Sequence, residues 1–414
     1  MKKHLPILTV LLLSIAVHFA YFGHPRETVF DEVHFGKFVS GYFTHEYFFD
    51  IHPPLGKLII SGAAKVAGFE PGFSFGQIGD QFPGNTYLAM RLLPTVAGVL
   101  LPVVIALLLL ELGFSRIAAT VAGLLIVFEN ALLVQSRFML LDAFLLLFGF
   151  TAWWLYARYR NHPRIGYLIA AAGFAGLSAS VKWTGITFLA IIAVLEIKRF
   201  RNLVILAVVP FAIYYSLFAI HFSLLFKPGP GDAFMTQEFR DGKLSTFDKF
   251  IELNKQMYDA NKRLTATHPY SSKWYAWPLM TRPIYYWNEG FAKIYLMGNP
   301  IIWWASTFGI VYILFSTAIA RKKFFWLVSG AYLLNMLPFI GIDRAMFLYH
   351  YFIGLIIAII ALVYYIDSLE NRKKAFAVLF ALSFVAFIIY APISYGLHLS
   401  EKAFEYRMFL KSWK

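Results

Sequence analysis

The sequence predicts an all-α protein that crosses a membrane many times. Its 414 residues are 59% hydrophobic and 19% aromatic, and only 14% are charged. Because soluble domains carry about 25% charged residues, this composition excludes an ordinary soluble globular protein. The chain also contains no cysteine. Disulfide bridges, thiolate metal sites and cysteine nucleophiles are therefore excluded.

Hydrophobic runs of bilayer-spanning length support the same class. A helix needs roughly 17–25 apolar residues to cross a bilayer. About eleven runs meet or approach that length: 5–22, 87–110, 116–134, 139–157, 165–181, 183–197, 202–222, 301–320, 324–341, 346–366 and 375–396. The fifth and sixth are short, so tilted or broken helices are expected there. The first follows Lys2 and Lys3 as a signal peptide would, but it lacks a clear small-residue cleavage site, so we expect an uncleaved anchor.

The distribution of charge predicts the orientation in the membrane. Alternate short loops hold 15 basic and four acidic residues, a net charge of +11, while the rest of the chain adds +3 to the total of +14. Short loops rich in Lys and Arg stay cytoplasmic, so the N-terminus is expected inside. The 15 basic residues are Lys2, Lys3, Arg116, Arg158, Arg160, Arg164, Lys198, Arg199, Arg201, Arg321, Lys322, Lys323, Arg372, Lys373 and Lys374. No basic face interleaved with aromatic residues occurs in a soluble segment, so nucleic-acid binding is not indicated.

Two long segments are expected on the outer side of the membrane, residues 23–86 and 223–300. In the first, helical spacing relates the apolar residues Phe35, Phe38, Val39, Tyr42 and Phe43. We expect an amphipathic helix there, lying along the outer membrane surface. Pro53 and Pro54 end that helix, and Pro54 can open a second helix from Leu55.

The second outer segment separates two membrane halves. The cluster Pro228-Gly229-Pro230-Gly231 marks where the chain leaves the membrane. A helical pattern follows from Ser245 to Leu264, and then an aromatic run from His268 to Trp287. We therefore expect an N-terminal membrane domain over 1–222, an outer loop over 223–300 and a C-terminal four-helix membrane domain over 301–414.

An acidic pair, Asp31 and Glu32, lies just past the first hydrophobic run. Carboxylates at a membrane surface lose solvation, so the pair indicates a site. The structural alternative is a helix start, in which Asp31 is the N-cap and Glu32 favours the helix dipole. The two interpretations are compatible, because a helix N-terminus also keeps a carboxylate ionised and able to accept a proton.

Three short outer loops each carry one cation, namely Arg137, Lys182 and Arg344. The positive-inside trend depletes outer loops of such residues. Any one of them could anchor a helix end by snorkelling. Three on the same side as the acidic pair fit a site for an anionic headgroup better, because a phosphate would satisfy all of them.

The remaining polar groups allow more than one interpretation. Asp142 and Glu129 are acids in or near apolar runs, which makes them functional candidates or partners of cations. His34 and His52 are more typical of hydrogen-bonded loop histidines than of metal ligands. No cluster with metal-ligand spacing accompanies the acids, so the sequence requires no metal or other cofactor. The aromatic run from Trp274 to Trp287 is either a membrane-interface belt or a wall for the acceptor or the sugar.

Taken together, these motifs resemble the protein O-mannosyltransferases, which are polytopic glycosyltransferases with a lipid-phosphate sugar donor. The ordered set covers most of the chain and is far more specific than any one motif. In the N-terminal half the matching segments are Phe30–Lys37, Phe49–Lys57, Ser136–Asp142 and Ser180–Gly185. In the C-terminal half they are His268–Trp274, Trp277, Pro278, Arg282, Gly298–Pro300, Trp303, Trp304, Arg344 and Phe347–Tyr351.

The resemblance implies a GT-C-type fold and transfer of mannose from a polyprenyl (dolichyl-type) phosphate mannose to Ser or Thr hydroxyls of proteins. Transfer is expected at the extracytoplasmic face of a prokaryotic cell membrane. Arg137 is the first candidate for the donor phosphate, supported by Lys182 and Arg344. Asp31 is the expected general base, with Glu32 orienting the acceptor or holding a basic neighbour. One carboxylate in a direct displacement implies inversion, and the retaining alternative forms a covalent glycosyl-carboxylate.

The resemblance also suggests further substrate-binding residues and a departure from the family pattern. The substrate-binding candidates are His52, Asp142, His268, Tyr270 and Trp274. Eukaryotic members carry a β-trefoil of MIR repeats in the outer loop, for which residues 223–300 are too few. The chain therefore resembles the compact prokaryotic members, and acceptor recognition is expected at the membrane-proximal surface. Members often act as dimers, although the sequence shows no decisive interface.

Two other functions stay open at this point. A related transferase that moves aminoarabinose onto a glycolipid would share the membrane architecture and an outer acid, and its acceptor would distinguish it. A secondary transporter would show inverted repeats and broken helices with polar groups at mid-membrane. Here the charges cluster at the outer ends of the spans and in the outer loops, which favours chemistry at the surface.

Overall fold

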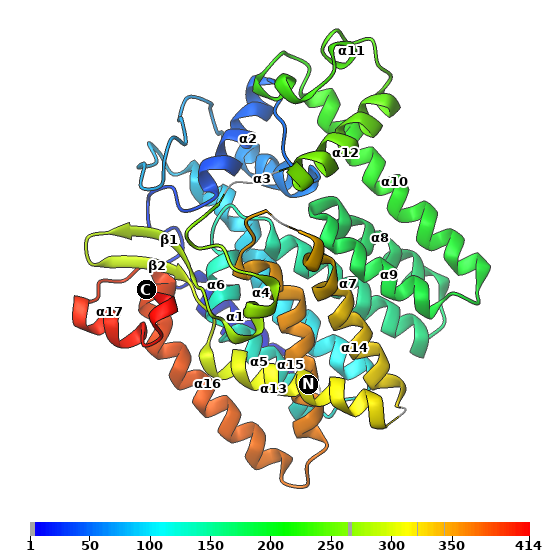
Figure 1. The fold of residues 1–414 in the computed structure, drawn as a ribbon, viewed down its shortest axis with the longest axis vertical. Coiled ribbons are helices and arrows are strands. Elements are labelled where there is room, and N and C mark those ends of the chain that lie inside the picture. Colours follow the sequence, from blue (N-terminus) through cyan, green and yellow to red (C-terminus); the bar gives the residue numbers. More distant parts are fainter. Residues whose placement is uncertain (1–4, 264–266, 321, 343) are drawn as a thin grey trace.

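The computed structural model describes residues 5–263, 267–320, 322–342 and 344–414 (Figure 1). Long helices form a bundle, and shorter helices, loops and a hairpin cover one of its ends. We call this end the α2 end, after helix α2 (Glu32–Thr44). The charged residues Lys2, Lys3 and Arg321, and the expected helix end at Leu264, lie outside the described residues.

Each expected membrane run coincides with one helix of the bundle or with a pair of them. These helices are α1 (Leu5–Phe19), α4 (Thr86–Glu111), α5 (Arg116–Val127), α6 (Asn130–Ser136), α7 (Asp142–Asn161), α8 (Ile165–Val181), α9 (Ile186–Leu195), α10 (Phe200–Leu224), α13 (Pro300–Ile319), α14 (Lys323–Met336), α15 (Phe352–Asp367) and α16 (Arg372–Tyr395). Among the described residues, six helices are long and apolar enough to cross a membrane, and a bent pair makes up to seven. The chain is thus a multi-span membrane protein, while the expected number of about eleven spans stays a prediction.

The bent pair is α5 and α6, whose axes differ by 60°. Glu129 causes the second helix to restart, because its carboxylate accepts a hydrogen bond from Leu132 N at 2.7 Å as the N-cap. The same carboxylate accepts from Asn299 N at 2.7 Å, just before α13. The break therefore joins the N-terminal and C-terminal halves of the chain.

Helices α4 and α15 lie at the centre of the bundle, and most of their residues are buried. Helix α7 packs against both α4 and α8, and α13 packs against α15. Helix α10 forms one edge (Figure 1). Only 17% of its most apolar window is buried, so most of its apolar surface faces outward, as expected of a helix that contacts lipid.

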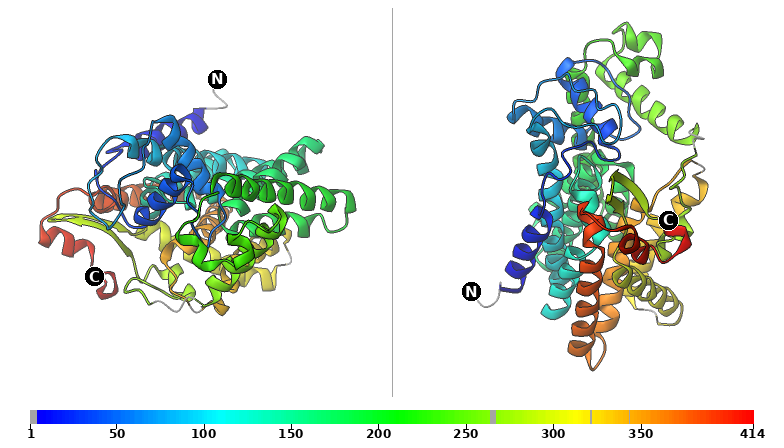
Figure 2. Two further views of the ribbon diagram at one scale, coloured as in Figure 1. Left: turned by 90° about the horizontal axis from the view of Figure 1, so that it is seen from above. Right: turned by 90° about the vertical axis from the view of Figure 1, so that its left-hand side faces the viewer.

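Short elements form the layer at the α2 end, and in the view from above they lie over the long helices (Figure 2, left). Its helices are α2, α3 (Leu55–Val66), α11 (Gln237–Arg240), α12 (Thr246–Arg263) and, near the chain end, α17 (Glu401–Arg407). The 3-10 helices of the chain are η1 (Trp183–Gly185), η2 (Pro230–Phe234), η3 (Trp274–Leu279), η4 (Leu337–Gly341), η5 (Leu348–Tyr351) and η6 (Lys411–Trp413). Strands β1 (Ile284–Glu289) and β2 (Ala292–Leu296) pair antiparallel. This hairpin falls in the aromatic run, where no strand was predicted.

The two helices expected in residues 23–86 are both present. Helix α2 begins after Asp31, and α3 begins directly after Pro54. The apolar face of α2 is buried against protein, since Phe35 and Val39 belong to the main core and Tyr42 packs on Phe48. The Ser245–Leu264 prediction corresponds to α12.

Candidate active site

A cavity of about 470 Å³ lies at the α2 end, where segments far apart in the sequence meet. Five parts of the chain contribute: the turn before α3, the start of α7, the α8–α9 junction, the end of α12, and the loop between α14 and α15. The lining residues are Ile51, His52, Asp142, Leu145, Leu146, Lys182, Trp183, Thr184, Tyr258, Asn261, Lys262, Phe339, Gly341, Ile342, Arg344, Tyr349, His350, Phe352 and Ile353.

Lys182 and Asp142 form an ion pair in the wall of this cavity. The Lys182 ammonium donates to the two carboxylate oxygens of Asp142 at 2.8 and 2.9 Å. Helix geometry explains the pairing, because Lys182 caps the C-terminus of α8 and Asp142 is the first residue of α7. The Lys182 ammonium also lies over the ring of Tyr349, 5.1 Å from its centroid. A cation is thereby held at the cavity surface.

A chain of hydrogen bonds continues from this ion pair into the core. Gln135 Nε2 donates to Asp142 at 2.6 Å, and the buried Tyr286 hydroxyl donates to the Gln135 carbonyl oxygen. Tyr286 stacks on Phe30, with ring centroids 4.1 Å apart. Phe30, the residue before Asp31, therefore packs on the same hydrogen-bonded network that holds Lys182.

Asp31 is partly buried and precedes α2 without capping it, because its side chain makes no capping hydrogen bond. Burial raises the pKa of its carboxyl to about 7, against the opposing charge of Lys182, while Asp142 and Asp50 raise it further. The Asp31 carboxyl therefore changes between its protonated and ionised forms near neutral pH. A carboxyl with this pKa is suited to accept a proton during a reaction.

Glu32 has a different environment from its neighbour. Its side chain is fully buried and forms a two-pronged pair with Arg91 of α4, at 2.8 and 2.6 Å. The carboxylate also accepts from Val29 N at 2.9 Å and Met139 N at 3.0 Å. Arg91 in turn donates to three backbone carbonyls, those of Gly23, Pro25 and Glu27. Glu32 thus holds a basic neighbour and does not line the cavity.

His52 and Arg344 complete the polar part of the wall. Burial lowers the pKa of His52 well below its usual range, helped by the charges of Lys182, Lys57 and Arg344. His52 is therefore neutral. Arg344 lies in the same wall, and within the described part of the chain its buried Nε has no hydrogen-bond partner. The cavity thus presents two cations, of which Arg344 retains an unused donor.

The turn that carries His52 is stabilised by Lys57. Its ammonium is buried, pairs with Asp50, and donates to the carbonyls of His52 at 2.8 Å and Pro53 at 3.2 Å. All the hydrogen bonds of this ammonium go to residues of the turn. It shapes the site without lining the 470 Å³ cavity.

Comparison with known proteins places this architecture in a family. The model described as dolichyl-phosphate-mannose-protein mannosyltransferase matches residues 8–226. The chain belongs to this family. A second model, the C-terminal four-TMM region of protein O-mannosyltransferase, matches residues 246–413.

Characterised relatives agree with this assignment. The chain is 35% identical over 274 residues to dolichyl-phosphate-mannose–protein mannosyltransferase 4 of Candida albicans. This alignment covers 59% of this chain and 36% of that protein. It is 34% identical over 270 residues to protein O-mannosyltransferase 1 of Drosophila melanogaster, covering 58% and 30%. In these two alignments the matched region thus spans about a third of the relative's own length.

Solved structures confirm the expected GT-C-type fold. The Saccharomyces cerevisiae protein O-mannosyltransferase Pmt1–Pmt2 complex bound to the sugar donor matches with a TM-score of 0.93 at 21% identity, covering 100% of this chain and 93% of that one. ArnT from Cupriavidus metallidurans bound to undecaprenyl phosphate matches with a TM-score of 0.57 at 13% identity, covering 94% and 65%. The Archaeoglobus fulgidus oligosaccharyltransferase gives the same score at 15% identity, covering 96% and 54%.

In this mannosyltransferase-family chain, Arg137 lies outside the lining of the 470 Å³ cavity. It is buried, and its guanidinium donates to the carbonyls of Ala20 at 2.5 Å and Tyr21 at 2.7 Å. It also lies over the ring of Tyr395, 4.6 Å from the centroid. These carbonyls follow the end of α1, where helices leave carbonyl groups unpaired. Arg137 therefore ties α1 to α6 and α16, and its phosphate-binding role stays a prediction.

His268, Tyr270 and Trp274 also lie outside the cavity lining. His268 is exposed and packs edge-on against Phe347, with centroids 5.0 Å apart. Tyr270 lies beneath the guanidinium of Arg282, at 5.3 Å. These three residues belong to the surface beside the cavity, whereas His52, Asp142, Lys182 and Arg344 line it.

Several residues that line the cavity were not among the site residues predicted from the sequence. Tyr349 and His350 line the cavity within a segment that carried the family resemblance. Tyr258, Asn261 and Lys262 come from the end of α12, and no local pattern distinguished them. Among the described residues, no group of three or more His, Asp or Glu could hold a metal ion.

Proposed function

We propose that this chain transfers mannose from a polyprenyl (dolichyl-type) phosphate mannose to Ser or Thr hydroxyls of proteins. One observation carries the proposal: Lys182 and Arg344 line a single cavity, and the charge of Lys182 acts on the Asp31 carboxyl, which lies outside the lining itself. The family assignment supplies the donor and acceptor classes. The extracytoplasmic location of the site follows from the charge of the loops and is part of the proposal.

The cations act on the leaving phosphate. The donor is a phosphate diester with one negative charge, and loss of the sugar produces a monoester with a charge of about −1.5 to −2. Attraction to Lys182 and Arg344 therefore grows as the bond breaks, which stabilises the transition state more than the bound donor. The free Nε of Arg344 is suited to this role, and Asp142 holds Lys182 in place. Of the three predicted phosphate ligands, Lys182 and Arg344 line the cavity and Arg137 does not, so we assign the main role to these two residues.

Asp31 acts on the acceptor. The hydroxyl of Ser or Thr must lose its proton as it attacks the anomeric carbon, and a carboxylate with a pKa of about 7 can take that proton at neutral pH. Because one carboxylate serves a direct displacement, the product is expected with inverted configuration. His52, held neutral beside the cations, is available as a hydrogen-bond partner for the sugar.

The test supplies membranes containing the chain with labelled polyprenyl phosphate mannose and a Ser/Thr-rich peptide. We expect label on the peptide, its loss in Asp31→Asn, and its retention in the control Asp241→Asn, an exposed outer carboxylate paired with Lys243. Label on a glycolipid would instead favour the aminoarabinose-type alternative. Asp31→Asn protein that folds, binds donor and transfers mannose at the normal rate would exclude Asp31 as the base.

A further inference from the structure

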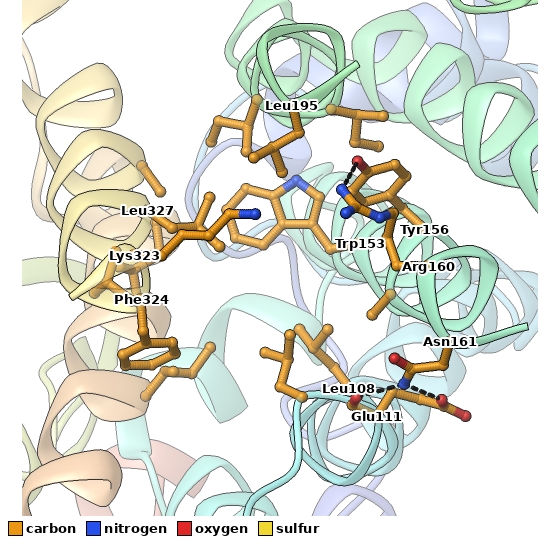
Figure 3. Close-up of a pocket in the computed structure, with 18 residues that line it drawn as sticks. Leu108, Glu111, Trp153, Tyr156, Arg160, Asn161, Leu195, Lys323, Phe324 and Leu327 are labelled. Carbon is orange, nitrogen blue, oxygen red and sulfur yellow. Dashed lines mark hydrogen bonds between the residues drawn. The ribbon is translucent and has the colours of Figure 1, made fainter. Parts of the chain in front are cut away.

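A second cavity, drawn in Figure 3, lies at the end of the bundle opposite the α2 end. Its volume is about 230 Å³, and its walls come from the ends of α4, α7 and α9, the start of α14, and α15. Most of the lining is apolar. The lining residues are Leu108, Glu111, Leu112, Trp153, Tyr156, Ala157, Arg160, Asn161, Ile191, Ile192, Leu195, Lys323, Phe324, Leu327, Val328, Ala331, Ile357 and Ile360.

Two cations approach this cavity from opposite walls. Lys323, the first residue of α14, extends across the opening toward Trp153 (Figure 3). Within the described residues its ammonium has no ion-pair or hydrogen-bond partner. Arg160 reaches in from α7 and donates to the Tyr156 hydroxyl at 3.2 Å, and its side chain is 38% exposed.

The acids near these cations are already neutralised. Glu111 pairs with Arg158 at 2.6 Å and accepts from the Asn161 amide at 3.1 Å. Glu196 lies 3.8 Å from Arg160, yet it is engaged more closely by Arg199 at 2.9 Å. The rim therefore has a surplus of positive charge over a hydrocarbon interior, which complements an amphiphile with an anionic head.

We propose that this cavity binds an anionic phospholipid from the adjoining leaflet. The phosphate lies at the rim with Lys323 and Arg160, and part of one acyl chain enters between Trp153 of α7 and Leu327 of α14. This site goes beyond the proposed transfer reaction. A hydrocarbon tail reaching down from the cavity at the α2 end would need no cations here, so the charged rim favours a lipid whose head is at this end.

The test measures lipid bound to the purified full chain by native mass spectrometry. Phosphatidylglycerol and phosphatidylcholine with identical acyl chains are compared at equal concentration. We expect the wild-type chain to retain phosphatidylglycerol preferentially. Lys323→Gln should weaken its binding about fivefold, since one Lys near a membrane surface contributes about that factor. The matched control Lys373→Gln removes an exposed cation at the start of the neighbouring helix α16 and should leave binding unchanged.

A second variant tests the acyl-chain part of the site. Ala157→Phe fills the cavity and should abolish retention, whereas Val385→Phe on the exposed face of α16 should not. Equal retention of the two lipids, or wild-type retention by Lys323→Gln, would overturn the proposal even if Ala157→Phe does not fold. Displacement of the lipid by polyprenyl phosphate with no effect of Lys323→Gln would also overturn it. These readouts do not depend on mannose transfer, so they stand apart from the proposed function.

Discussion

Asp31 and Glu32 are neighbours in the chain, yet their surroundings give them different chemistry. Glu32 is enclosed and meets Arg91 in a two-pronged pair, with two backbone N–H groups donating to the remaining acceptor positions. Asp31 makes no capping bond, and the charges of Lys182, Asp142 and Asp50 act on its carboxyl. A buried carboxylate whose acceptor positions are all hydrogen-bonded stabilises the fold. A carboxyl with a raised pKa and no side-chain hydrogen bond is available for a reaction.

The largest effect is expected on the transfer rate, when Asp31 is replaced and Glu32 is kept. Asp31→Asn should lower the transfer rate about 10²–10⁴-fold, the usual contribution of a general base. Its thermal unfolding in detergent should match that of the wild-type chain, because the Asp31 side chain does not cap α2. Rate and unfolding temperature are measured on the same preparation. A large fall in both would make Asp31 a structural residue like Glu32.

The converse change should act on stability. Glu32→Gln leaves the Arg91 guanidinium buried without its counter-ion, which should cost about 3–5 kcal/mol of unfolding free energy. The control Glu238→Gln alters an exposed carboxylate on α11 and should have little effect. Thermal unfolding followed by scanning fluorimetry measures both. A Glu32→Gln protein as stable as wild type would contradict the structural role.

The cations of the cavity can be compared with a cation outside it. Lys182→Met and Arg344→Gln should each lower kcat about 10²-fold, as expected for one donor that stabilises a developing oxyanion. Lys37→Met removes an exposed cation of α2 and should change the rate little. Transfer from labelled donor measures all three. Equal, small effects at Lys182, Arg344 and Lys37 would remove the phosphate role.

The pKa of Asp31 predicts a pH dependence. Because only the carboxylate accepts a proton, the rate should fall about tenfold per pH unit below the pKa of about 7 and level off above it. Initial rates from pH 5 to 8.5 measure the profile. In Asp31→Asn the residual rate should lose this limb. A flat wild-type profile would show that another group takes the proton.

The smallest effect is expected at Arg137. Arg137→Lys keeps the charge but cannot reach both carbonyls, so it should cost about 1–2 kcal/mol of stability. Donor affinity should not change, because the residue does not line the cavity. Equilibrium binding of a donor analogue and thermal unfolding distinguish the two. Weakened donor binding without loss of stability would restore the original phosphate assignment.

The helices of the bundle were predictable because long apolar runs have few other structures available in a membrane. The resemblance suggested different roles for Asp31 and Glu32, but it could not identify the basic neighbour of Glu32, since Arg91 lies far along the chain. A lone Arg within the apolar run 87–110 was the available signal. The role of Arg137 depends in the same way on carbonyls at the end of α1. Charge alone cannot tell whether a cation will meet a ligand or a helix end.

The hairpin was also missed, although its turn had a signal. Gly290 connects the strands with φ +56°, a conformation that glycine adopts at little cost. The aromatic residues around it fit a belt at the membrane interface equally well. Their pairing as strands, with Tyr285 opposite Tyr295, depends on contacts across the hairpin that local composition does not reveal.

The bend between α5 and α6 has a consequence for biosynthesis. The Glu129 carboxylate acquires the backbone N–H of Asn299 as its partner only after another 170 residues have been made. The side-chain amide of Asn299 also donates to the carbonyls of Phe128 and Ser383. The ribosome therefore releases the first half of the protein with a polar corner still incomplete. Insertion of α13 supplies the Asn299 partner and insertion of α16 supplies the Ser383 carbonyl, so nascent chains arrested before α13 should be degraded, while those arrested after α16 should survive.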